Sequence, residues 1–175
     1  GSDTGEINCT ETSNPGVDFV AECTVEWEKS VDPFIAQGIR VVKLRTGLVM
    51  ASEGGIFRVL ARPVYWFFGA ILGTGMQWQS WIHIDDLVEI FHQSLINSSA
   101  SGVYNAVAPE PIRHADMIRM IAKKLKRPLF FPAIPTWFLK IILGELAGLV
   151  TGGNFVSSQK IQKELSFTFK FTSFA

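Results

Sequence analysis

A short run near the middle of the chain carries side chains suited to hydrogen bonding and proton transfer. If this run forms a strand, Gln79, Trp81 and His83 share one face and can line a ligand cleft. A second interpretation is structural, with Asp85 or Asp86 capping the following helix and His83 bonding nearby backbone. The sequence leaves both interpretations open.

Two glycine-containing segments offer backbone groups to a ligand. Leu44-Arg-Thr-Gly47 ends a predicted parallel strand, and ligands of open α/β sheets bind beyond the carboxyl ends of strands. Gly47 would let a ligand approach the backbone closely, and Gly54-Gly55 ahead of a helix would present N–H groups to an anion. Ordinary turn chemistry explains both segments equally well.

Several familiar catalytic and cofactor-binding signatures are missing from the sequence. It has no GxGxxG after a strand, no P-loop, no GxSxG and no HExxH. Cys9 and Cys23 lack the spacing and the neighbours of a zinc site or a disulfide framework. One Glu89-x-x-His92 pair falls short of the two pairs that a di-iron site needs. The sequence therefore predicts no metal site.

Composition bounds the partners and the compartment. Hydrophobic residues make up 47% of the 175 residues and charged residues 18%, which excludes a disordered chain. Sixteen Lys and Arg balance sixteen Asp and Glu, so nucleic acid is excluded as the main partner. The mean hydropathy of +0.24 indicates a large core or an apolar surface that another piece covers. Because no apolar signal segment is visible, we expect a cytoplasmic protein.

The elements that must position these residues are helices alternating with a few short strands. Apolar spacing predicts helices near 18–34, 56–66, 86–96, 115–125, 135–150 and 157–165, and strands near 39–46, 76–84, 102–107 and 167–171. Pro33 should end or kink the first of these helices. Strands separated by helices favour a parallel α/β sheet, although the first βαβ unit of a doubly wound sheet is absent.

Two of these helices carry specific expectations. The helix near 86–96 should begin at an Asp85 cap, and its expected buried residues are Leu87, Val88, Phe91 and Leu95. The apolar run 129–150 is long enough to cross a membrane, but it contains prolines and charges at Pro132, Pro135, Lys140 and Glu145. We therefore expect a buried helix there and no membrane partner.

Taken in order, the segments resemble a known family. They are Val41-Val-Lys-Leu-Arg-Thr-Gly-Leu-Val49, Leu72-Gly-Thr-Gly75, Ser80-Trp-Ile-His-Ile-Asp-Asp-Leu87 and Tyr104-Asn-Ala-Val-Ala-Pro109. This order resembles the epimerase-family branch of the extended or atypical short-chain dehydrogenase/reductases over nearly the whole chain. The resemblance implies the back part of a Rossmann-like parallel sheet in residues 1–128. Residues 129–175 would form a smaller, mostly helical C-terminal substrate lobe.

The resemblance also implies a cofactor and a set of contacts. A complete family member would begin with a glycine-rich half that binds NAD or NADP, and we expect this chain alone to bind neither. The family pattern maps cofactor contacts onto Thr46, Gly47 and Leu48, and substrate contacts onto Val49, Gly54, Gly55, Gln79 and Trp81. Gln79 stands where nucleotide-sugar epimerases carry a phosphate-binding arginine, which disfavours a nucleotide-sugar substrate.

The family's Tyr-x-x-x-Lys dyad falls at Val20 and Thr24, neither of which suits proton transfer. No catalytic residue is therefore assigned, and three hypotheses remain. The first is part of an NAD(P)-dependent epimerase or reductase acting on a small hydroxyl or carbonyl substrate. The second is a non-catalytic cofactor-sensing or protein-interaction module, and the third is a membrane-associated protein using residues 63–72 and 137–150. We also expect homo-oligomers or self-association, because the strand near 39–44 would have an unpaired edge. The apolar stripe of the first helix, Val20, Cys23, Trp27 and Val31, would also need an apolar partner.

Overall fold

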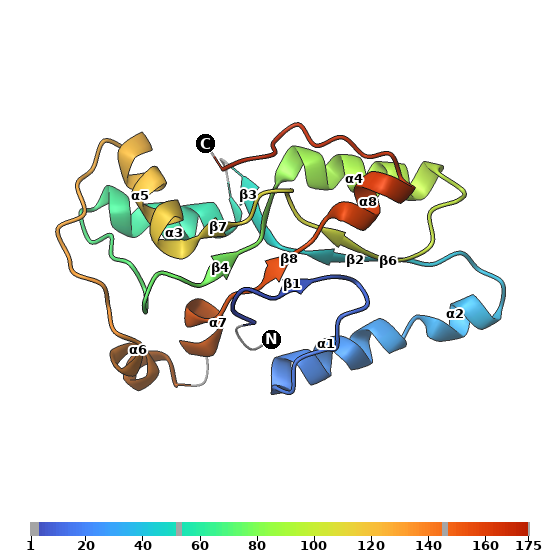
Figure 1. Cartoon of the computed structure of the whole chain (residues 1–175), viewed down its shortest axis with the longest axis horizontal. Helices are drawn as coiled ribbons and strands as arrows, with labels where there is room; N and C mark the ends of the chain where they lie inside the picture. Colours follow the sequence, from blue (N-terminus) through green and yellow to red (C-terminus); the bar gives the residue numbers. More distant parts are fainter. Residues whose placement is uncertain (1–3, 52–53, 145–146, 175) are drawn as a thin grey trace.

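The computed structural model describes residues 4–51, 54–144 and 147–174 (Figure 1). Its helices are α1 (Phe19–Lys29), α2 (Asp32–Ala36), α3 (Gly55–Tyr65), α4 (Ile84–Ile96), α5 (His114–Lys124), α6 (Thr136–Leu143), α7 (Ala147–Thr151) and α8 (Gln159–Glu164). Its strands are β1 (Asn8–Cys9), β2 (Val42–Thr46), β3 (Leu48–Ala51), β4 (Trp78–Gln79), β5 (Trp81–His83), β6 (Gly102–Ala106), β7 (Ile112–Arg113) and β8 (Phe155–Val156). This alternation confirms the predicted α/β class.

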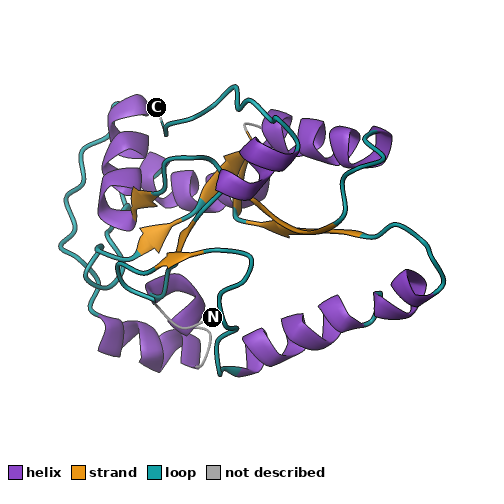
Figure 2. Cartoon of the chain, turned by 45° about the vertical axis from the view of Figure 1, so that its right-hand side comes forward, coloured by secondary structure: helices purple, strands orange, loops and turns teal. Residues whose placement is uncertain are grey.

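The described strands pair two by two, and most of the pairs are parallel. β2 pairs with β6, β3 with β5 and β1 with β8, while β4 and β7 run antiparallel. The longest pair runs in register from Val42 opposite Gly102 to Thr46 opposite Ala106. Parallel partners lie far apart in the sequence, because a crossover must carry the chain back between them. Figure 2 shows the strands in the middle of the molecule with helices around them.

Two clusters of apolar side chains surround the paired strands. One joins Ile82 and Tyr104 to Phe167 near the end of the chain. The other joins Trp81 to Met117 of α5. The first cluster combines residues from both sides of position 128, so the two predicted regions share a core. Their boundary between residues 128 and 129 stays a prediction.

The first predicted helix is in fact two helices. Asp18 caps α1 by accepting a hydrogen bond from Ala21 N at 2.9 Å, and Pro33 lies in the first turn of α2, where an N–H has no helical partner. The apolar stripe expected on this segment is exposed, with Trp27 at 78% and Val20 at 43%. In both views these helices extend away from the others (Figures 1 and 2). Self-association through this stripe stays a prediction.

Helix α4 begins and packs differently from the prediction. Its N-cap is His83, whose Nδ1 accepts a hydrogen bond from Asp85 N at 3.2 Å, so the predicted Asp85 cap is wrong. The predicted buried stripe is right only at Leu87; the side chains that face solvent are those of Val88, Phe91 and Leu95. The helix turns another face inward, burying Asp86, Leu87, Ile90 and Ser94. A prediction based on the spacing of apolar residues cannot identify a buried polar residue such as Asp86.

The apolar run 129–150 does not form one buried helix. Helix α6 is followed by Gly144, whose φ of +56° lies in the region that glycine tolerates best, and α7 begins at Ala147. Trp137 and Ile141 on α6 are 64% and 74% exposed, so the prediction of a buried helix is wrong. Within the described ranges, no helix has both the length and the apolar character needed to cross a membrane.

The C-terminal segment, residues 166–174, is a loop rather than the predicted strand. Phe167 and Phe169 are nevertheless buried, and their rings meet edge to face with centroids 4.8 Å apart. The backbone is held by Asp86, whose carboxylate oxygens accept hydrogen bonds from Lys170 N at 2.9 Å and Phe171 N at 3.0 Å. The alternation of phenylalanines therefore indicates burial, not strand pairing.

Candidate functional site

At Gly47 the chain changes pairing partners. Gly47 N donates a hydrogen bond to Ala106 O of β6, and the next amide, Leu48 N, donates to Ser80 O at 2.8 Å. A Cβ atom on residue 47 would press against the Ser80 carbonyl oxygen and would lie 2.9 Å from Val107 Cγ1. The sequence suggested that a ligand would approach the backbone at Gly47, but the backbone of Ser80 makes that close approach. This contact, where the chain passes from pairing with β6 to pairing with β5, is sufficient reason for a glycine at position 47.

The neighbours of Gly47 divide between solvent and core. Thr46 is exposed at the carboxyl end of the parallel pair β2–β6, where its hydroxyl can reach a ligand. Leu48 and Val49 are half-buried and pack against the two apolar clusters. Of the predicted contact residues from Thr46 to Val49, Thr46 is therefore the one with a polar side chain exposed to a ligand.

Gly54 and Gly55 lie at the start of α3. Gly54 is extended, forms an isolated bridge with Ala51, and has no atom within 4 Å of the position its Cβ would take. Among the described residues, no side chain caps α3, so its first N–H groups depend on other partners. Ser52 and Glu53, which precede these glycines, lie outside the described residues.

The three side chains expected on one strand face have separate surroundings. Trp81 is only 3% exposed; its Nε1 donates to Glu110 O at 2.9 Å, and its ring meets Phe174 edge to face. His83 stacks on a tail phenylalanine, with ring centroids 3.8 Å apart. Gln79 is half-buried in the antiparallel pair β4–β7, opposite Ile112. Trp81 thus lies in the core, and Gln79 lies in a different strand pair.

Strand register brings some of the predicted residues together. Leu48 lies opposite Trp81 in the pair β3–β5. On α1, the two positions of the family's dyad carry no acid or base: Val20 is apolar, and Thr24 Oγ1 donates to Val20 O at 2.8 Å. Within the described structure, the predicted cofactor edge therefore has an exposed hydroxyl at Thr46, and the two dyad positions carry no proton-transfer group.

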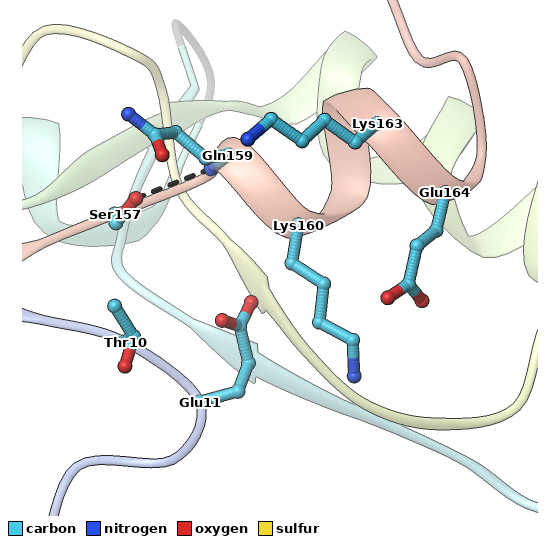
Figure 3. A pocket seen from close by; sticks show the side chains of 7 residues that line it. All are labelled: Thr10, Glu11, Ser157, Gln159, Lys160, Lys163 and Glu164. Atoms are coloured by element: carbon cyan, nitrogen blue, oxygen red, sulfur yellow. Dashed lines mark hydrogen bonds between the residues drawn. The ribbon is translucent and has the colours of Figure 1, made fainter.

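A pocket that the sequence did not predict opens where the parallel strands β1 and β8 end (Figure 3). Its volume is about 370 Å³, and its lining residues are Thr10, Glu11, Ser157, Gln159, Lys160, Lys163 and Glu164. Figure 3 shows Lys160 and Glu164 extending from α8 toward the segment that carries Glu11. Because the lining comes from the two ends of the chain, no local spacing in the sequence could reveal it.

Hydrogen bonds tie the charged lining groups to β6. Lys160 Nζ donates to a β6 carbonyl at 2.8 Å and lies 4.6 Å from the centroid of the Tyr104 ring. The Tyr104 hydroxyl donates to Glu164 Oε2 at 3.0 Å, and Glu11 Oε1 accepts from Asn105 N at 2.9 Å. Charges of both signs and two hydroxyls suit a small polar ligand. The carboxyl end of a parallel pair is also the usual ligand position in such sheets.

Burial, reinforced by the hydrogen bond to Glu164, raises the pKa of Tyr104 above its ordinary value of 10.0. The phenol therefore keeps its proton at neutral pH and serves as a donor, not as a base. In a folded protein the neutral form is favoured more than in the unfolded chain. The stability that this gives is present below pH 10 and is lost as the pH rises through the folded pKa.

Substituting Tyr104→Phe is expected to lower the free energy of unfolding by about 1 kcal/mol, the usual net value of one hydrogen bond. It should also remove the phenolate absorbance step that occurs above pH 10. Alkaline titration of the folded protein checks this, with Tyr65→Phe as the matched control because these are the two tyrosines of the chain. A Tyr104 step at or below pH 10 would contradict the assignment.

The amino-acid sequence is similar to those of known epimerase family proteins. The chain is 38% identical over 170 residues, 97% of its length, to an Arabidopsis thaliana protein described as an epimerase family protein, SDR39U1 homolog, chloroplastic. It is 34% identical over 89% of its length to an epimerase family protein of Staphylococcus aureus. The resemblance to the epimerase family is confirmed. The chain spans about half the length of these two relatives, 48% and 51% respectively.

Epimerase-family structures agree with the fold. The human epimerase family protein SDR39U1 (isoform 2), determined with NADPH, gives a TM-score of 0.87 at 25% identity, over 98% of this chain and 58% of that one. A nucleoside-diphosphate sugar epimerase from Corynebacterium glutamicum gives 0.78 at 32% identity, over 99% of this chain and 33% of that one. A family model described as a domain of unknown function (DUF1731) matches residues 134–175, which contain α6, α7 and α8.

Proposed function

We propose that this chain provides the substrate side and the nicotinamide edge of an NAD(P)-dependent epimerase-family protein. The observation that carries the proposal is similarity over 97% of the chain to an epimerase family protein, supported by the NADPH-bound human relative. The chain spans about half of the curated relatives, so the activity belongs to the complete protein. The substrate class we propose is a small molecule with a hydroxyl or carbonyl group.

The fit of the chain to such a cofactor is partial. Thr46 is exposed at the carboxyl end of β2, where a hydroxyl can hydrogen-bond the nicotinamide end. Leu48, half-buried beside it, would pack against the ring. The sequence contains no GxGxxG turn between a strand and a helix, which is the motif that cradles a dinucleotide pyrophosphate. When bound, the nicotinamide supplies or accepts a hydride; the residues of this chain would orient it and shield it from water.

A non-catalytic role is the second candidate. The observation that favours it is the side chains at the dyad positions, Val20 and Thr24, of which Thr24 bonds its own helix. Tyr104, which holds its proton, does not replace the missing base. Loss of NADPH absorbance with a panel of small carbonyl compounds would favour the enzyme, and tight cofactor binding without turnover would favour the sensor.

The cofactor edge can be tested in a chimera in which this chain replaces the matching region of the Arabidopsis relative. Thr46→Glu is expected to weaken NADPH binding by about tenfold or more, because the longer, negatively charged side chain would crowd and repel the negatively charged cofactor. The control is Thr168→Glu, since Thr168 is also exposed but lies in the tail. Equal NADPH affinity of the two folded variants would contradict the proposed position of the cofactor.

A further inference from the structure

Six large aromatic side chains gather at one end of the molecule and face solvent. They are Trp66, Phe68, Phe130, Phe131, Trp137 and Phe138, and each is at least 42% exposed. We call this set the aromatic face. It comes from the loop after α3, the connection between α5 and α6, and the first turn of α6, which lie along the left of Figure 1. Exposed apolar patches of this kind mark a docking surface.

The aromatic face is assembled by specific contacts. Phe68 stacks on Phe131 with ring centroids 5.8 Å apart, and both line an apolar pocket of about 370 Å³ together with Phe138. Backbone hydrogen bonds hold the two loops together: Ile134 N donates to Ile71 O at 2.8 Å, and Gly73 N donates to Ile134 O at 2.8 Å. These contacts join the two loops that carry Phe68 and Phe131.

Basic residues outnumber acidic ones in the segments that carry the aromatic face, and the one Asp, Asp116, forms an ion pair with Arg119 at 2.8 Å. Residues 54–77 and 114–144 contain eight Lys and Arg but one Asp, a local charge of +7 in a chain whose formal charge is zero. Exposed members of this basic set are Arg58, Arg62, Arg119, Lys123, Lys124, Lys126 and Lys140. The guanidinium of Arg127 lies 4.6 Å from the ring centroid of Phe67 and links the basic set to the aromatic loop. The partner must therefore be apolar and negatively charged.

We propose that this end of the molecule docks on an anionic lipid surface. Tryptophan and phenylalanine enter the boundary between headgroups and acyl chains, while flanking Lys and Arg bind the lipid phosphates. Peripheral contact of this kind needs no spanning helix. A second copy presenting the same end would bring like charges together, so the charge disfavours a symmetric dimer through this face. The proposal does not depend on the cofactor.

Co-sedimentation of the 175-residue chain with vesicles tests the proposal. The chain should bind vesicles of phosphatidylcholine mixed with phosphatidylglycerol, and it should bind pure phosphatidylcholine vesicles at least about tenfold more weakly. Substituting Lys123, Lys124 and Lys126 together by Ala should reduce binding by about tenfold or more. The matched control replaces three exposed lysines elsewhere, Lys29, Lys163 and Lys170, and should bind like the unmodified chain.

A second pair of variants tests the apolar part of the contact. Trp137→Ser should weaken binding to the mixed vesicles, whereas Trp27→Ser, at the even more exposed tryptophan of α1, should not. Absence of binding to the mixed vesicles, or equal loss in both lysine triples, would overturn the proposal. It would also be overturned if light scattering showed a dimer that Trp137→Ser dissociates, because a second copy would then occupy the face.

Discussion

Replacing Gly47 by alanine is expected to lower the free energy of unfolding by about 3 kcal/mol, at the upper end of the cost of overpacking. The new methyl group would press on the Ser80 carbonyl oxygen and lie 2.9 Å from Val107 Cγ1. The contact with Ser80 is with backbone that β5 and β3 hold in place, so little relaxation is available. Chemical denaturation of the variant measures the loss.

Gly54→Ala is the matched control for this substitution. It changes the other glycine segment that the sequence marked as a candidate ligand site. No atom lies within 4 Å of the added Cβ, and the residue is extended, so the free energy of unfolding should change by less than about 1 kcal/mol. If Gly47→Ala lowered the free energy of unfolding as little as Gly54→Ala, the close contact with the Ser80 backbone would not be the reason for the glycine at position 47.

Replacing Asp86 by alanine is also expected to lower the free energy of unfolding by about 3 kcal/mol. Its carboxylate is 1% exposed and accepts the backbone N–H groups of Lys170 and Phe171, and hydrogen bonds to charged groups are the stronger kind. The variant should also release the C-terminal segment, so limited proteolysis should cut within residues 166–174 earlier than in the unmodified protein.

Two further variants test whether the stability depends on the charge of Asp86 and on its position rather than that of Asp85. Asp86→Asn keeps the shape but turns one acceptor into an N–H donor, so it should lose part of the same stability. Asp85→Ala removes an exposed carboxylate in the first turn of α4, which should cost no more than about 1 kcal/mol. A larger loss for Asp85→Ala than for Asp86→Ala would mean that the helix start, not the tail, is what this pair of aspartates stabilises.

The local spacing of apolar residues was sufficient to predict the helices and strands in which that spacing is regular. The strand β6 and the helices α3 and α5 lie within a few residues of their predicted ranges, because each carries a regular apolar period. Parallel pairing also followed from strands that alternate with helices. The predicted helix at 18–34 divides because the first turn of α2 takes Pro33, a position where proline fits.

Non-local contacts decided what the sequence could not predict. Asp86 is buried because its carboxylate oxygens accept hydrogen bonds from backbone N–H groups more than eighty residues later in the chain. Burial of Asp86 orients α4 so that Phe91 and Leu95 face solvent. The burial of Trp81 likewise depends on contacts with residues distant in the sequence, Glu110, which is 29 residues away, and Phe174 near the end of the chain. The polar pocket joins Glu11 to α8, and only the pairing of β1 with β8 brings these together.

The proposed function depends most on the division of cofactor contacts between this chain and the rest of an epimerase-family protein. Calorimetric titration of NADPH into the 175-residue chain and into the chimera with the Arabidopsis relative measures that division directly. The chain alone should bind very weakly, because groups that hold a pyrophosphate supply much of the affinity, and the chimera should bind in the micromolar range. Low-micromolar binding by the chain alone, or no binding by a folded chimera, would contradict the account.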